Sequence, residues 1–227
     1  MTRRVLLRRT VEVAAGGMLG GALGTAVGGL RPVRAGPCEI FPPDGTARFL
    51  MRRGNRVIGR HDIRFARRNG RFIVRSDVRA DIGNGGWRFR HHAEEVWREG
   101  WLHAVVSDTD DDGRRYRVRA ERRGGIFGGT VNGTGFTVSG YLIPSSLWHH
   151  DTIAVEALFD TVDARVKLVR SYDLGAMTVA VGGRPVLARH YRQVGEIARE
   201  VWYDAGCRLV QVAFIARGGV PVTVERT

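Results

Sequence analysis

Beyond about residue 45, apolar and polar residues alternate along the chain in short segments that glycine-rich turns separate. In residues 71–75, three apolar residues lie between Arg71 and Arg75, and in residues 115–120 Arg115, Arg117 and Arg119 alternate with less polar residues. Successive side chains of a strand point to opposite faces of the sheet. The pattern therefore predicts β-strands with one buried face and one wet face.

The turns between these segments predict that neighbouring strands pair in chain order. Asn69-Gly70 is the strongest hairpin signal, and glycine turns also occur at residues 99–100, 110–113, 182–183 and 218–219. The predicted strands are residues 49–52, 56–67, 71–82, 87–99, 101–109, 114–122, 166–173, 177–181, 185–191, 198–203, 208–216 and 220–225, with a loosely held hairpin in 124–140. We expect a mainly β fold, a single antiparallel meander of about ten to twelve strands that curls into a barrel or half-barrel.

The alternation breaks at residues 144–148, Pro-Ser-Ser-Leu-Trp. Ser145 or Ser146 suits the N-cap of a short helix. Residues 151–162 can form a second helix, although their β-branched side chains suit a strand equally. We expect one or two short helices and little helix elsewhere.

The first 35 residues have the features of an export signal. Arg3-Arg4 is a twin-arginine pair, an apolar stretch broken by glycines covers residues 11–27, and Val33-Arg34-Ala35 suits cleavage. We expect a cleaved signal in residues 1–35, one antiparallel β domain in 36–227, and a periplasmic or otherwise exported protein. An uncleaved membrane-spanning helix over residues 11–30 is the alternative.

Charge narrows the classes of partner. The formal net charge is +13, and because residues 1–35 hold six arginines and one glutamate, the remaining chain keeps +8. Nucleic acid is a poor partner for an exported protein, whereas an anionic membrane surface or an anionic ligand suits this charge. The two cysteines, Cys38 and Cys207, lie near the ends of the expected mature chain. In an oxidising compartment they favour a disulfide, with two unpaired thiols as the alternative.

The order of several short motifs resembles the exported bacterial families DUF6134 and DUF3108. The motifs are Ile58-Gly59, Glu95-Val96-Trp97, residues 107–113, Ser146-Leu147-Trp148 and a closing hairpin in 201–209. The resemblance implies a curved antiparallel sheet around an apolar concavity, wrapping a small helical segment as in periplasmic lipoprotein carriers. It implies no established activity, and it makes Cys207, in the closing hairpin, the partner of Cys38.

The aromatic residues are the main candidates for a ligand pocket, because a curved sheet must fill or line its concavity. Core packing is the alternative role for all of them. The candidates are Trp87, Trp97, Trp101, Trp148 and Trp202, together with His149 and His150 from the segment that leaves the β pattern.

Three clusters suggest chemistry, but none completes a site. On a strand, residues 91–95 place His91 and Glu95 on one face and His92 and Glu94 on the other, which is too few ligands per face for zinc. The acidic residues of 108–113 lack the frame of an EF-hand and suit a solvated turn.

His61 with Asp62, or His149 with Asp151, could form an imidazole–carboxylate pair for acid/base work, with Ser145 or Ser146 as the nucleophile, but no Gly-x-Ser-x-Gly motif is present. We therefore assign no catalytic residue, metal or cofactor. We expect a noncatalytic periplasmic binder or carrier of an apolar or amphipathic molecule such as a lipid. A periplasmic hydrolase that uses residues 148–151, or an envelope assembly protein, is the alternative.

Overall fold

A computed structural model describes residues 43–83 and 86–227 of the chain. The expected signal in residues 1–35 lies outside the described residues. The described chain is mainly strand. Its strands are β1 (Gly45–Arg53), β2 (Arg56–Arg68), β3 (Arg71–Asp81), β4 (Arg88–Arg98), β5 (Trp101–Asp111), β6 (Arg114–Arg123), β7 (Ile126–Val131), β8 (Thr134–Ser139), β9 (Ala157–Phe159), β10 (Val166–Val181), β11 (Arg184–Gly195), β12 (Arg199–Asp204), β13 (Leu209–Ala216) and β14 (Val220–Arg226).

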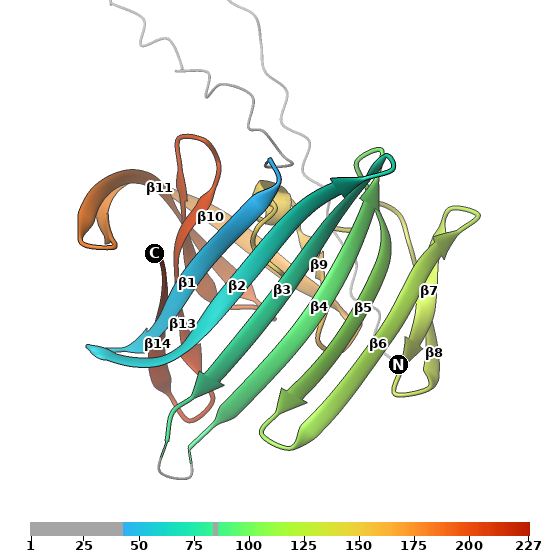
Figure 1. Cartoon of the computed structure of the whole chain (residues 1–227), viewed down its shortest axis with the longest axis horizontal. Coiled ribbons are helices and arrows are strands. Elements are labelled where there is room, and N and C mark those ends of the chain that lie inside the picture. The colour runs from blue at the N-terminus through green and yellow to red at the C-terminus, as the bar shows by residue number, and fades with distance from the viewer. Residues whose placement is uncertain (1–42, 84–85) are drawn as a thin grey trace, which may run out of the picture. The chain divides into compact units, whose positions relative to one another are not determined.

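All these strands form one sheet whose two halves each follow chain order. The sheet runs from β8 back to β1, crosses to β14, and then runs back from β14 to β9. The halves join where β1 pairs antiparallel with β14, with Phe49 opposite Arg226 and Arg52 opposite Thr223. Figure 1 shows the sheet curving, so that β13 and β14 lie behind β1 and β2. The predicted antiparallel meander is confirmed.

The curl is a half-barrel rather than a closed barrel, because β8 and β9 form two separate edges of the sheet. The edges approach one another through side chains. Phe159 of β9 packs on Phe127 of β7 and Phe136 of β8, with ring centroids 5.3 and 6.0 Å apart. The sheet curls around residues 140–165, which we call the crossing segment. Its Trp148 contacts β4 and its Thr152 contacts β12.

The alternation predicted from the sequence determines which face of each strand is buried. In β3, Phe72, Val74 and Ser76 are buried on the concave face, and Arg71 and Arg75 are exposed on the convex face. The Asn69-Gly70 turn joins β2 to β3 with φ angles of 50° and 70°, the left-handed backbone that this turn type requires. Local turn chemistry and period-two patterning therefore set both the pairing and the inside of the sheet.

Residues 151–162, which the sequence left open between helix and strand, do not form an α-helix. Helix among the described residues is confined to one 3₁₀ turn, η1 (His150–Ile153), and the chain then extends into β9. The reason is backbone pairing inside the concavity, since Phe159 N–H donates to the Ile143 carbonyl and Ser145 N–H to the Phe159 carbonyl, both at 2.9 Å. No helix in the described part of the chain has the length and apolar character needed to span a membrane.

The strand count also differs from the prediction of ten to twelve. Residues 124–140 form two complete strands, β7 and β8, and β9 is an additional short strand. The segments predicted separately at 166–173 and 177–181 are one strand, β10, which continues through a register shift between Asp173 and Gly175. Gly175 adopts a φ of 90° there, so a glycine that the sequence presents as a break is a bulge within the strand.

Candidate ligand-binding cavity

A cavity of about 340 Å³ lies inside the half-barrel, between the concave faces of its two halves and the crossing segment. This volume is within the range of small-molecule sites, about 300–1,000 Å³. Most of the side chains around it are apolar. The lining residues are Met51, His61, Ser76, Val78, Trp87, Phe89, His91, Ser145, Ser146, Leu147, Thr161, Val162, Ile197, Ala198, Arg199, Leu209, Val212, Phe214 and Val224.

Four polar atoms on residues that line the cavity are buried without a hydrogen-bond partner. They are Nε2 of His61 on β2, Oγ of Ser76 on β3, Oγ of Ser146 in the crossing segment and one terminal nitrogen, Nη2, of Arg199 on β12. An unsatisfied buried polar group costs about 1–3 kcal/mol, so native proteins carry few of them. The cavity therefore combines a mainly apolar lining with several buried polar atoms that no described residue satisfies.

Arg199 is the charged group of the cavity. Its Nε donates to Oε1 of Gln193 at 2.6 Å, and its Nη1 donates to the Ser145 carbonyl at 3.0 Å. Burial lowers the pKa of Arg199 to about 10, opposed by Tyr203 and Asp160, so the guanidinium stays charged at neutral pH. Its two hydrogen-bond partners are both uncharged.

Two histidines occupy one lateral row of the concave face, because His61 and His91 both stand opposite Val78 in the register of β2, β3 and β4. His91 shares hydrogen bonds with Thr109 Oγ1 at 2.8 Å and Thr161 Oγ1 at 3.3 Å. Burial lowers the pKa of each histidine to about 4. Both rings are therefore neutral at neutral pH, and they add hydrogen-bonding capacity to the cavity without adding charge.

Beside the cavity, a buried carboxylate anchors the crossing segment to the sheet. Oε2 of Glu95 on β4 accepts hydrogen bonds from Nε1 of Trp97 at 3.0 Å and Nε1 of Trp148 at 2.9 Å. Burial raises the pKa of Glu95, and these indole donors together with the nearby Ser146 hydroxyl oppose that rise. The Ser146 oxygen does not reach hydrogen-bond geometry with the carboxyl. Trp148 thus positions Ser146 and Leu147 over the cavity.

The tryptophans singled out from the sequence lie in four different places. Trp87 lines the cavity, and its Nε1 donates to Asp111 Oδ1 at 2.6 Å. Trp97 and Trp148 pack edge to face beside it, with centroids 5.4 Å apart. Trp101 is 45 % exposed on the outside of the sheet. Trp202 belongs to a separate apolar cluster with Val179, Ala188 and Val210.

The two candidate histidines of the crossing segment also separate. His149 is fully buried and stacks on Trp97 at 5.0 Å between centroids. His150 lies against Tyr203 and lines a second cavity of about 180 Å³ together with Trp148 and Cys207. Ser145 and Ser146 line the main cavity instead. These histidines and serines therefore do not converge on one cleft in the described part of the chain.

The predicted division of residues 91–95 between two faces is confirmed. His91, Ala93 and Glu95 are buried on the concave face, whereas His92 is exposed and its Nδ1 lies 2.8 Å from Asp77 Oδ1. Within residues 43–83 and 86–227, no group of three or more histidine, cysteine or acidic side chains is placed to hold a metal ion.

Cys207 is described and is not a free thiol. Its expected partner Cys38 lies outside the described residues, so the pairing of the two stays a prediction.

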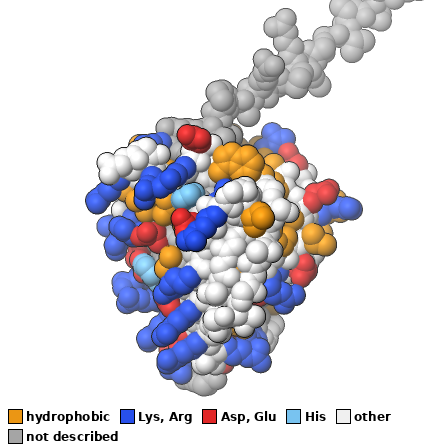
Figure 2. Space-filling model, turned by 90° about the vertical axis from the view of Figure 1, so that its right-hand side faces the viewer, with side chains coloured by type: hydrophobic (Ala, Val, Ile, Leu, Met, Phe, Trp, Pro, Cys, Tyr) orange, Lys and Arg blue, Asp and Glu red, His pale blue; other side chains and the backbone are white. Residues whose placement is uncertain are grey.

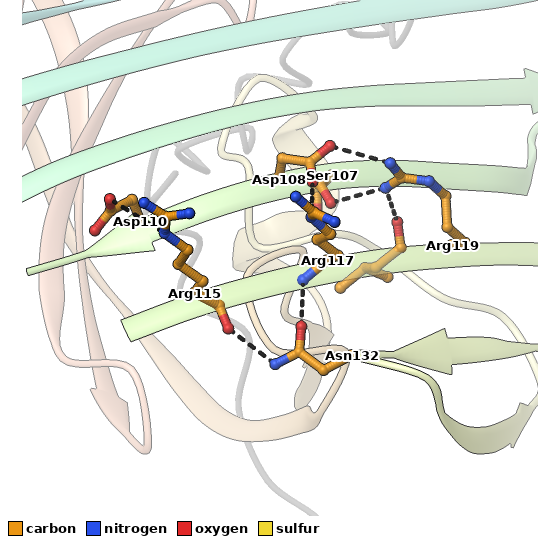
Figure 3. A network of polar contacts seen from close by, with 8 residues as sticks. Ser107, Asp108, Asp110, Arg115, Arg117, Arg119 and Asn132 are labelled. Atoms are coloured by element: carbon orange, nitrogen blue, oxygen red, sulfur yellow. Dashed lines mark hydrogen bonds and ion pairs between the residues drawn. The ribbon is translucent and has the colours of Figure 1, made fainter. Parts of the chain in front are cut away.

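The convex face carries most of the arginines, and acidic residues lie among them. Figure 2 shows basic and acidic side chains mixed over one side of the molecule. In Figure 3, Asp108 of β5 accepts from Arg119 at 3.1 Å and lies 3.3 Å from Arg117, while Asn132 bonds the backbone of β6. Exposed pairs of this kind add little stability, and they reduce the positive potential that this face presents to an anionic partner.

The inward-facing polar residues are the ones that sequence reasoning did not assign to the pocket. Arg199 shares a face of its strand with Val201 and Tyr203, which are buried. An arginine in phase with two core residues is the signal that could have identified it, because charged residues are almost never buried without a partner. Ser76 gives the same signal, since it lies two residues after the buried Val74 and therefore on the same face of β3.

The fold and the cavity together define an open antiparallel β half-barrel with an internal, mainly apolar cavity. The chain belongs to the DUF6134 family, since the family model described as a domain of unknown function (DUF6134) matches residues 49–227. No curated protein and no solved structure gives a significant match to it.

Proposed function

We propose that this protein is a noncatalytic binder or carrier that holds an apolar or amphipathic small molecule in the cavity of the half-barrel. The observation that carries the proposal is a cavity of about 340 Å³ whose mainly apolar lining includes buried polar atoms without partners. A ligand with an apolar body and a polar end would exclude water from the lining and satisfy those atoms.

A noncatalytic role is favoured by how the candidate catalytic groups are placed. A hydrolase of the expected kind needs a serine within hydrogen-bond reach of a histidine. Ser145 instead directs its hydroxyl to Asp160 Oδ1 at 3.5 Å, and His150 lines the other cavity. His61 and His91 line the main cavity together with Ser145 and Ser146. His61 Nε2 and Ser146 Oγ have no hydrogen-bond partner among the described residues, and His91 bonds to Thr109 and Thr161.

We further propose that the protein works after export, at or near an anionic membrane surface. The supports are the twin-arginine pair in the expected signal and the net positive charge of the chain. Replacing Arg3 and Arg4 with lysine should leave the unprocessed protein in the cytoplasm, which cell fractionation measures. Export of the variant at the wild-type level would contradict the export route.

Native mass spectrometry of the protein purified from its host, followed by organic extraction, tests the binding proposal. We expect a stoichiometric adduct in the wild type. Val78→Trp should remove it by filling the cavity, and Val106→Trp should keep it because Val106 is exposed on the outer face of β5. A wild-type protein without adduct that also fails to bind added amphiphiles would refute the proposal.

A further inference from the structure

We infer that the ligand carries a single carboxylate head, which the free Nη2 of Arg199 binds inside the cavity. This inference rests on the proposed function and specifies the chemical class of its ligand. The ligand is then a single-chain amphiphile of the fatty-acid type, with its tail along the apolar side chains that β1, β13 and β14 contribute.

The arrangement around Arg199 suits ligand recognition better than a purely structural role. Nε and Nη1 are held by Gln193 and the Ser145 carbonyl, so the guanidinium is fixed in position. Gln193 is itself fixed through Nε2, which donates to the Thr152 carbonyl at 2.7 Å. A neutral side chain could link these uncharged groups without the desolvation penalty of a buried charge. The retained charge indicates a charged partner.

That partner is not supplied by the described chain. None of the ion pairs among the described residues includes Arg199. Asp160 is the acid that acts on it electrostatically, but its carboxylate accepts the Val162 N–H at 2.9 Å and lies 3.9 Å from Lys167 Nζ. The Nη2 donor is thus buried beside the cavity without a partner from the described chain, and arginine is well shaped to bind a carboxylate.

The charge of the cavity favours a monoanion. Arg199 is the cationic side chain among the lining residues, and the neighbouring His61 and His91 are neutral at neutral pH because burial lowers their pKa values. One positive charge balances one carboxylate, whereas a phosphate monoester brings a second negative charge that nothing in the lining compensates. A cationic head would be repelled.

The volume sets the size of the tail. A cavity of about 340 Å³ equals the liquid volume of roughly eleven waters at about 30 Å³ each. A methylene group occupies a similar volume, so a tail of about ten carbons fills the site. Decanoate is therefore the appropriate probe.

The test is calorimetric titration of the delipidated full chain with four amphiphiles that each contain ten carbons in one chain: decanoate, 1-decanol, decylamine and decyl phosphate. We expect decanoate to bind at least about tenfold more tightly than 1-decanol, the size of one charge-assisted hydrogen bond. Arg199→Gln should lose this preference and still bind 1-decanol. Arg192→Gln is the matched control, since Arg192 is exposed and pairs with Glu200 at 3.0 Å.

Each outcome separates this inference from the proposed function. If none of the four probes binds, the proposed function fails. If 1-decanol, decylamine or decyl phosphate binds as tightly as decanoate to the wild type, the carboxylate inference is overturned and the binding cavity stands. If Arg199→Gln keeps the full preference for decanoate, Arg199 is not the head-group site. Circular dichroism verifies that Arg199→Gln is folded. If this variant does not fold, the affinities of the wild type for the four probes still decide which head group the cavity prefers.

Discussion

Replacing Trp148 with phenylalanine tests whether the buried Glu95 anchors the crossing segment. The change keeps an aromatic ring against Phe65 and Trp97 but removes the Nε1 donor that lies 2.9 Å from Glu95 Oε2. The carboxyl, 1 % exposed, is then left with one indole donor. Losing one partner of a buried acceptor costs about 1–3 kcal/mol. In a domain of this size, that corresponds to a fall in Tm of roughly 4–8 °C for about 2 kcal/mol.

The assay is thermal and urea unfolding followed by circular dichroism, with Trp101→Phe as the matched control. Trp101 is 45 % exposed and packs on Tyr141 and Arg122, so its replacement should change the free energy of unfolding by less than about 1 kcal/mol. In a Glu95→Gln background, the effect of Trp148→Phe should shrink. Equal destabilisation by both tryptophan variants, or full additivity with Glu95→Gln, would refute the anchor.

Three further predictions concern groups inside or near the half-barrel. Burial lowers the pKa of His61 from 6.5 to about 4, so the unfolded chain binds more protons than the folded chain between these pH values. The free energy of unfolding should therefore fall as pH drops through that window, by on the order of 3 kcal/mol for this group. In urea titrations at several pH values, His61→Gln should reduce this dependence on pH. Ser76→Ala should leave Tm unchanged or raise it, since the Ser76 Oγ has no hydrogen-bond partner. Thr152→Val should lower Tm because it breaks the 2.9 Å hydrogen bond to the Tyr203 hydroxyl. A larger fall in Tm for Ser76→Ala than for Thr152→Val would contradict these hydrogen-bond assignments. If Cys38 and Cys207 are joined, the processed protein should show no reactive thiol when denatured without reductant, and two reactive thiols would exclude the bond.

Strand formation and chain order were predictable because they depend on neighbours in the sequence. Asn69-Gly70 needs only two residues to form its turn, and residues 115–120 alternate strictly enough to assign an inner and an outer face. The same reasoning separated His91 and Glu95 from His92 correctly. The conformation of residues 151–162 could not be predicted in this way, because it depends on backbone pairing of Phe159 with Ile143 and Ser145, which lie outside the segment itself.

The function of individual tryptophans could not be predicted from the pattern. Trp101 and Trp148 each have one leucine neighbour in the sequence, but the first is exposed on the outer face and the second is 5 % exposed beside Glu95. What distinguishes them is the curl of the sheet and the path of the crossing segment. Both are long-range features that no local spacing encodes.

The sequence by itself determined the β-strands, the turns that join them, the side of each strand that faces inward and the family to which the chain belongs. Only the tertiary structure decided which inward-facing residues surround empty space. Arg199 illustrates the difference: its phase with Val201 and Tyr203 is local, but its isolation from any ion-pair partner among the described residues arises where β12 meets the crossing segment. Cavities form where curved surfaces fail to close on one another, and that depends on the whole sheet.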